Sequence, residues 1–287
     1  MGSQRALASS TASSRSVEAP AMRPRTGAET WRLILHFGTA GLVVVLFALP
    51  LAAAAQPAGK VFQIGYLGNS TPSVETGLVE AFRQGLRENG YVEGKDVVVH
   101  YRWADGHIDT FPVLAAELVR LKVDVIVTSG TSGSLAAQRA TKTIPIVVAA
   151  VGDAVGVGLV PSLARPGGNV TGLSALTAEL EGKRLEVLRE LVPKVGGVSV
   201  LMNPANPFTA LAWKETQAAG AKLRLTLHPA EVRTVDAFDA VFAAIVKTRP
   251  DALVVIADRF LMSNRKRIVA FAAQHRLPAM YTFREFV

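Results

Sequence analysis

One stretch, residues 123 to 153, constrains the fold of this chain more than any other. It opens with an apolar run rich in β-branched residues, Val123 to Val127, which suits a strand buried on both faces. A small polar turn and a helical segment follow, and a second apolar run from Ile144 to Val151 leads to Asp153. Strand, turn, helix and strand in this order predict two parallel strands joined by a right-handed crossover. In open parallel sheets, ligands bind beyond the carboxyl ends of the strands.

The rest of the chain repeats this alternation, which predicts an α/β fold class with two successive lobes. We place the first lobe at residues 58–175 and the second at 176–287. The predicted strands are residues 61–67, 96–103, 123–127, 144–151, 169–173, 198–202, 223–227, 252–257 and 278–281. The predicted helices are residues 74–89, 110–121, 135–140, 156–163, 178–191, 207–220, 235–247 and 264–275.

Residues 1–55 have a different character and predict a disordered N-terminus followed by an export signal. Arg23, Arg25 and Arg32 precede an apolar run at 37–55, and Ala53 to Ala55 supply the small residues that signal cleavage requires. We therefore expect a periplasmic protein that begins at Gln56 after cleavage. The alternative is a retained membrane anchor, since the apolar run nearly suffices to span a bilayer. Met22 is an alternative start of translation.

Composition and motifs indicate neither catalysis nor nucleic-acid binding. The chain has no cysteine, so thiolate metal sites and cysteine nucleophiles are excluded. It lacks the phosphate-binding loop of nucleotide hydrolases and the nucleophile elbow of α/β hydrolases, and its histidines lack metal-ligand spacing. The net charge is +8, but no stripe of Lys and Arg tracks a phosphate backbone. We expect no catalytic residue, no metal and no cofactor.

Polar residues do gather at the carboxyl ends of the predicted strands, where they predict a site for a small-molecule ligand. Each alone is a common helix cap or turn residue, but the set combines hydroxyl groups with carboxylates. Hydroxyl and N–H groups suit a carboxylate, and Asp153 or Asp258 suits an ammonium group, which favours an amino acid; amides and other small polar solutes fit the same groups. The candidate ligand-binding residues are Asn69, Ser70, Ser129, Thr131, Ser132, Asp153, Asn203 and Asp258, with Tyr66, Trp103 and Phe208 as candidate aromatic contacts.

At these residues the chain resembles the substrate-binding proteins of ABC transporters, in the branch of tryptophan- and tyrosine-type binding components. The matching stretches include AFRQGLRENGYVEGKDVVVHYRWADG at 81–106, the Thr-Ser-Gly-Thr turn at 128–131, ARPGGNVTG at 164–172, LMNPANP at 201–207 and LVVIAD at 253–258. The resemblance implies two Rossmann-like lobes in the type 1 periplasmic-binding-protein architecture. It also implies that the turn at 129–132, Asp153, Asn203 and Asp258 line the cleft, and that Asn69 and Ser70 flank it.

Two departures from this family are visible. Ser132 stands where the family usually has proline, and the chain ends at Val287, before the final return to the first lobe. We therefore expect a C-terminally truncated member.

The resulting hypothesis is an exported protein that binds a small molecule and delivers it to an inner-membrane ABC permease. Contact with the membrane is expected only through an uncleaved signal. The alternative is an exported α/β enzyme of hydrolase type. A transcription regulator of the same fold is disfavoured because a signal segment, and no basic helix-turn-helix, precedes the first strand.

Overall fold

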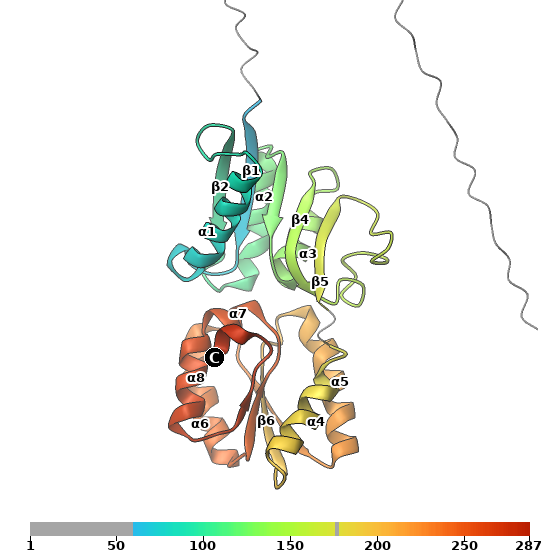
Figure 1. Cartoon of the computed structure of the whole chain (residues 1–287), viewed down its shortest axis with the longest axis vertical. Coiled ribbons are helices and arrows are strands. Elements are labelled where there is room, and N and C mark those ends of the chain that lie inside the picture. Colours follow the sequence, from blue (N-terminus) through green and yellow to red (C-terminus); the bar gives the residue numbers. More distant parts are fainter. Residues whose placement is uncertain (1–59, 176–177) are drawn as a thin grey trace, which may run out of the picture. The chain divides into compact units, whose positions relative to one another are not determined.

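The computed structural model describes residues 60–175 and 178–287 of the protein. The predicted disordered N-terminus and export signal at 1–55, with its apolar segment at 37–55, lie outside the described residues. Within the described part, the chain forms two sheets of parallel strands with helices on both faces (Figure 1). This confirms the predicted α/β class with parallel sheets.

The first sheet has the strand order β2-β1-β3-β4-β5, and all its pairs are parallel. Its strands are β1 (Phe62–Gly68), β2 (Val97–Trp103), β3 (Val125–Thr128), β4 (Ile146–Gly152) and β5 (Val170–Ala175). The interior strand β1 is buried from Ile64 to Gly68, as its mostly apolar sequence predicts. The βαβ unit β3–α3–β4 at residues 125–152 is the one that the sequence indicates most strongly.

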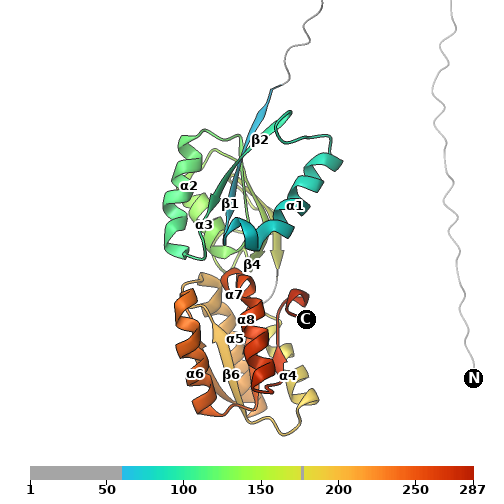
Figure 2. The same ribbon diagram turned by 90° about the vertical axis from the view of Figure 1, so that its left-hand side faces the viewer.

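Helices cover this first sheet on both faces. Helix α1 (Pro72–Glu88) lies on one face, and α2 (Phe111–Arg120) and α3 (Thr131–Ala140) lie on the other (Figure 2). The core beneath α2 and α3 contains fully buried Leu118, Ile126 and Ile146. On the α1 side, Tyr66, Tyr101 and Trp103 pack with ring centroids 5.5–5.7 Å apart.

The second sheet has the order β7-β6-β8-β9, again parallel throughout. Its strands are β6 (Gly197–Met202), β7 (Thr226–Glu231), β8 (Ala252–Val255) and β9 (Ala279–Met280). Helices α4 (Glu181–Leu191) and α5 (Pro207–Leu223) cover one face, while α6 (Phe238–Thr248) and α8 (Arg265–Gln274) cover the other (Figure 1). The short helix α7 (Arg259–Ser263) follows β8.

The strand alternation divides the second core into two layers. Val198, Val200 and Val254 face the α4 and α5 layer, whereas Leu201 and Leu253 face the α6 and α8 layer. Because strand side chains alternate between faces, a strand covered on both sides is expected to be apolar throughout. Strand β8 is apolar throughout, and β6 is apolar except for Gly197 and the buried Ser199. The strand ends are therefore held rigidly, and the loops that follow them are free to carry polar groups.

Three elements differ from the sequence prediction. Residues 156–163 form turns and bends instead of a helix, because Gly158 adopts φ 72°, outside the helical region. Helix α5 continues to Leu223 and ends at Arg224 in the left-handed conformation, so the predicted strand at 223–227 begins only at Thr226. That strand contains Pro229 and lies at the sheet edge, where a missing N–H is tolerated. Helix α7 was not predicted.

Candidate functional site

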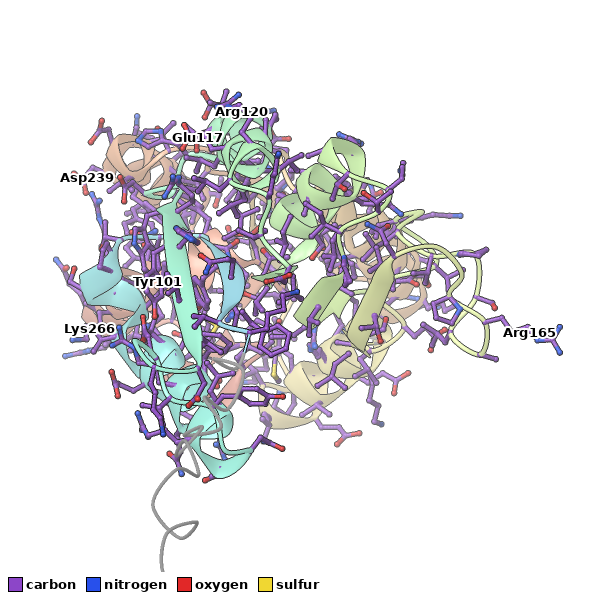
Figure 3. The ribbon with its side chains drawn as sticks, turned by 90° about the horizontal axis from the view of Figure 1, so that it is seen from above. Tyr101, Glu117, Arg120, Arg165, Asp239 and Lys266 are labelled. Atoms are coloured by element: carbon purple, nitrogen blue, oxygen red, sulfur yellow. The ribbon has the colours of Figure 1, made fainter. Side chains whose placement is uncertain are left out.

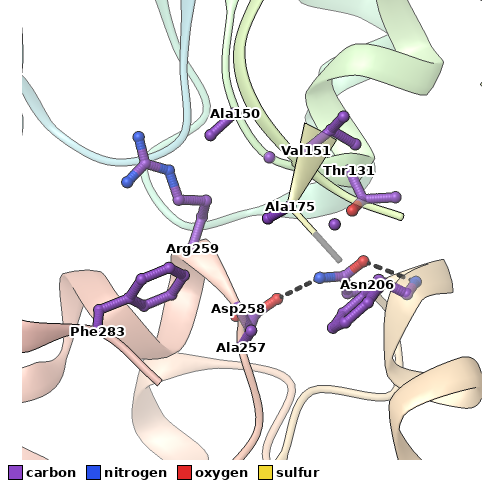
Figure 4. A pocket seen from close by; sticks show the side chains of 12 residues that line it. Thr131, Ala150, Val151, Ala175, Asn206, Ala257, Asp258, Arg259 and Phe283 are labelled. Carbon is purple, nitrogen blue, oxygen red and sulfur yellow. Dashed lines mark hydrogen bonds between the residues drawn. The ribbon is translucent and has the colours of Figure 1, made fainter. Parts of the chain in front are cut away.

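A hollow of about 470 Å³ lies at the carboxyl ends of strands from both sheets (Figure 4). Its walls come from the ends of β3, β4 and β5 in the first sheet and from the segments after β6, β8 and β9 in the second. The lining residues are Gly130, Thr131, Ala150, Val151, Gly152, Ala175, Asn206, Phe208, Ala257, Asp258, Arg259 and Phe283.

The first wall is built around the N-terminus of α3. Gly130 precedes the helix with φ 78°, a conformation that glycine adopts without strain, and its N–H donates to the Ala150 carbonyl over 2.7 Å. The chain then enters the helix at Thr131, whose side chain is buried against the hollow. The first N–H groups of a helix have no intrahelical partner, and they carry the positive end of the helix dipole. This wall therefore presents hydrogen-bond donors.

Next to it, the turn between β1 and α1 is organised by Glu75, a glutamate that is only 3% exposed. Its Oε1 accepts the backbone N–H groups of Asn69 and Ser70, both over 2.7 Å, and its Oε2 accepts the Tyr66 hydroxyl over 3.3 Å. Burial, with Glu75 beside it, raises the pKa of the Tyr66 hydroxyl well above its usual range. The Asn69 amide in turn donates to the Ser129 carbonyl over 3.0 Å. Glu75 thus fixes the turn that abuts the α3 N-terminus.

The second wall is a network of two amides and a carboxylate. Asp258 Oδ2 accepts from the Asn206 amide over 2.9 Å and from the Asn203 amide over 3.4 Å, while Oδ1 accepts the Leu261 N–H over 2.8 Å. Asp258 is thereby the N-cap of α7, and Asn206 is the N-cap of α5. Burial raises the pKa of the Asp258 carboxyl, and the hydrogen bonds from Leu261, Asn206 and Asn203 oppose that shift.

The sequence-based candidates did not include Arg259, Asn206 or Phe283, and Arg259 is the charged residue among these three. It is half-buried, and its Nε and Nη2 donate to the Ser129 hydroxyl over 3.1 and 2.8 Å, although the two residues are 130 positions apart. Its stem packs so closely on Gly130 that a Cβ there would lie 2.7 Å from the Arg259 Cγ. The available signal was its position, directly after the buried run at 252–257 that ends at a strand's carboxyl end.

Apolar side chains complete the hollow. Phe208 is buried and lies against Gly152, where a Cβ would come within 2.7 Å of the Phe208 ring. Phe283 lies near Asp258 and Arg259 in the close view (Figure 4). Together with Ala150, Val151 and Ala175, these rings give the hollow a largely apolar surface with few polar groups. That composition is typical of sites for small organic molecules.

Comparison with known proteins assigns the family. Residues 70–287 match the profile of the ABC transporter substrate binding protein family, which covers most of the chain. The chain belongs to this family. The match confirms the family resemblance noted in the sequence. The same comparisons contain no support for the hydrolase alternative.

Individual relatives agree with this assignment. The chain is 28% identical over 199 residues to the tyrosine-binding protein of Clostridioides difficile, an alignment that spans 69% of this chain and 57% of that protein. A crystal structure of a conserved domain protein from Vibrio cholerae matches with a TM-score of 0.71 at 27% identity, covering 79% of this chain and 76% of the other. A Streptococcus pneumoniae ABC domain in complex with L-Trp has the same fold, with a TM-score of 0.69 at 24% identity and the same coverage.

Further solved structures confirm the type 1 periplasmic-binding-protein architecture. The leucine-binding protein LivK of Thermotoga maritima shares the fold at 16% identity with a TM-score of 0.55, over 77% of this chain and 62% of the other. At this identity the likeness concerns the fold alone.

Several of the predicted ligand-binding residues lie close together in this member of the family. Thr131 and Asp258 line the hollow, and both also line an adjoining hollow of about 310 Å³ together with Asn69 and Ser132. Ser129 lies beside them through its contact with Arg259. Asn203 is fully buried behind Asp258, and Ser70 is buried near Glu75; neither lines these two hollows. Of the predicted aromatic contacts, only Phe208 reaches the wall.

Asp153 lies apart from this group. Its Oδ1 accepts the Gly156 N–H over 2.9 Å and closes a turn after β4, and Asp153 itself adopts φ 39°. Its neighbour Gly152 lines the hollow, but Asp153 does not. Asp153 therefore has a structural role in this turn, and the substitutions Asp153→Ala and Asp153→Asn test whether its charge also affects ligand affinity.

Among residues 60–175 and 178–287, no three His, Asp or Glu side chains are grouped as a metal site requires. No helix in that same part of the chain has the length and apolar character needed to cross a membrane.

Proposed function

We propose that this chain is the exported solute-binding component of an ABC transporter, which captures a small polar organic solute and delivers it to an inner-membrane permease. The observation that carries the proposal is the hollow at the strand ends, whose wall joins Thr131 of the first lobe to Asn206 and Asp258 of the second. A solute that contacts both walls stabilises the arrangement in which the walls are together. A permease would recognise that arrangement.

The site residues have distinct roles in this proposal. Thr131 and Ser132 offer donors at the start of α3, Asn69 and Ser129 hold the neighbouring turn, and the Asn203–Asn206–Asp258 network keeps the second wall rigid. The relative named a tyrosine-binding protein makes amino acids the first class of solute to test.

Binding is tested by thermal denaturation of the purified chain against amino acids, amides and small organic acids. We expect at least one solute to raise the melting temperature, because a ligand that binds only the folded state stabilises it by mass action. Isothermal calorimetry then gives the affinity, and chromatography of the solute after incubation checks that it is unchanged. Either a panel without any stabilising solute or the formation of product would overturn the proposal.

Export and delivery need their own test. Cell fractionation and mass spectrometry of the N-terminus should find the protein in the periplasm, starting at Gln56, because the small residues Ala53 to Ala55 precede that position. Deletion of the gene should abolish high-affinity uptake of the solute found by calorimetry. A cytoplasmic protein with residues 37–55 intact, or unchanged uptake, would contradict this part.

A further inference from the structure

The charged side chains around the hollow differ in how many of their hydrogen-bonding positions are already used within the protein. Only two charged side chains among the described residues line it, Asp258 and Arg259. Both oxygens of Asp258 already accept hydrogen bonds, from two buried amides and from the Leu261 N–H. Its geometry is that of a structural cap, and an ammonium group would have to displace one of these donors.

Arg259 is in the opposite situation. A guanidinium has five N–H donors, and three contacts are formed, two to the Ser129 hydroxyl and one to the Met262 sulfur. No ion pair joins Arg259 to any carboxylate in the described part of the chain. Glu75 and Glu285 border a neighbouring hollow that Arg259 also lines, but neither lines the main one. The half-buried cation thus keeps donors and charge that an acidic group of a ligand would complete.

Other features of the hollow also favour a negatively charged group on the ligand. The N-terminus of α3, at Thr131, adds the positive end of a helix dipole to the same hollow. The carboxylate of Asp153, which would suit an ammonium group, bonds Gly156 and does not line the hollow. Phe208 and Phe283 supply an apolar surface for the body of the ligand.

We infer that Arg259 determines specificity by anchoring a carboxylate, and that the ligand is a small organic acid with an apolar body and no charged amino group. This rests on the proposed solute-binding function and narrows its substrate class. A zwitterionic amino acid would bring an ammonium group into a hollow that offers a free cation and no free anion.

The test uses three sets of compounds with matched bodies, each set containing an amino acid, the acid without its amino group and the amine without its carboxyl group. The sets are alanine, propanoate and ethylamine; leucine, 4-methylpentanoate and 3-methylbutylamine; and phenylalanine, 3-phenylpropanoate and 2-phenylethylamine. Calorimetry with the full chain should find an acid that binds at least about tenfold tighter than its amino acid and its amine, as expected for one hydrogen-bonded charge pair gained or one ammonium group left unpaired.

Two variants test whether Arg259 is the residue responsible for binding the acid. Arg259→Gln removes the charge and should weaken binding of that acid by about tenfold or more. The matched control is Arg165→Gln, which removes the same charge from an exposed loop, where the side chain points into solvent (Figure 3). This control should leave the affinity within about twofold. Circular dichroism checks that both variants are folded. If Arg259→Gln does not fold, the preference of the unaltered chain for acids over amino acids and amines still tests the proposal.

The outcomes separate the two proposals. If an amino acid, an amine or an amide binds and no acid does, the anion assignment is wrong while the solute-binding function stands. Equal losses in Arg259→Gln and Arg165→Gln would also overturn the role of Arg259. If no compound of these sets or of the wider panel binds, both proposals are wrong.

Discussion

The two lobes each place a buried carboxylate at the carboxyl end of a strand, but they satisfy it differently. In the first lobe, Glu75 accepts two backbone N–H groups at 2.7 Å and one tyrosine hydroxyl. In the second, Asp258 accepts one backbone N–H and two side-chain amides, at 2.9 and 3.4 Å. Backbone donors are fixed by the fold, whereas amide donors must themselves be held in place. The first wall is therefore set by the path of the chain, and the second by side chains that hold one another.

The second lobe contains another buried acid, and this one is incompletely satisfied. Glu181 is fully buried at the start of α4; Oε1 pairs with Arg184, while Oε2 has no hydrogen-bond partner among the described residues. Burial raises the pKa of this carboxyl from 4.5 to about 7, against the opposing effect of Arg184. Glu75 and Asp258 accept hydrogen bonds at both carboxylate oxygens, whereas Glu181 does so at only one among the described residues.

The largest effect that tests this comparison is expected at Glu75. The substitution Glu75→Ala leaves the N–H groups of Asn69 and Ser70 and the Tyr66 hydroxyl without their acceptor in a buried turn. We expect the free energy of unfolding to fall by about 3–5 kcal/mol, the range for breaking a buried charged network. Urea denaturation followed by circular dichroism measures the change.

The matched control lies on the same helix. Glu80 is exposed and, among the residues that the structure describes, pairs with Arg83 alone, so Glu80→Ala should lower the free energy of unfolding by less than about 1 kcal/mol. Equal losses of stability in the two variants would mean that Glu75 contributes no more than a surface ion pair. The conclusion that its backbone hydrogen bonds hold the first wall would then be wrong.

Glu75 also illustrates what the sequence does and does not reveal. The strands were predictable because runs such as 125–127, 144–151 and 252–257 are apolar without interruption, as expected in a sheet covered on both faces. The family was predictable from specific local stretches. The role of Glu75 was not, because its partners lie in the preceding turn, and a glutamate in a first helical turn is common for other reasons.

Arg259 is a second residue whose role could not be predicted from the sequence. Thr131 and Asp258 were predictable as site residues because each follows a predicted buried strand. Arg259 reaches Ser129 across 130 positions, and helix α7, which begins with it, is too short to give a periodic pattern. The helix predicted at 156–163 was wrong, because Gly158 has φ 72°, outside the helical region.

A smaller effect, visible as pH dependence, is expected at Glu181. Because its pKa is higher in the folded state than in the unfolded state, the folded state binds more protons between the two values, and stability falls as pH rises from 4.5 to about 7. This group alone should lower the free energy of unfolding by about 2–3 kcal/mol between about pH 5 and pH 8. In Glu181→Gln that part of the pH dependence should disappear, as measured by urea denaturation at both pH values.

Here the control is Glu186→Gln, on the same helix but with an exposed carboxylate paired to Lys183. It should leave the pH dependence as in the unaltered chain. If Glu181→Gln and Glu186→Gln show the same slope, Glu181 titrates normally, and the second lobe does not contain the poorly satisfied acid that distinguishes it from the first.

The smallest effect is expected at Asp153, which directly follows strand β4 in the first lobe. Its carboxylate accepts a single backbone N–H, that of Gly156, and its φ of 39° is one that Asp and Asn tolerate better than Ala. Asp153→Ala should lower the free energy of unfolding by about 1 kcal/mol and change ligand affinity by less than about twofold. Asp153→Asn keeps the acceptor and the favoured conformation, so its stability should match the unaltered chain. Were Asp153 instead to pair with an ammonium group of the ligand, both variants would lose affinity together in calorimetry, and the first lobe would supply a free anion as well as backbone donors.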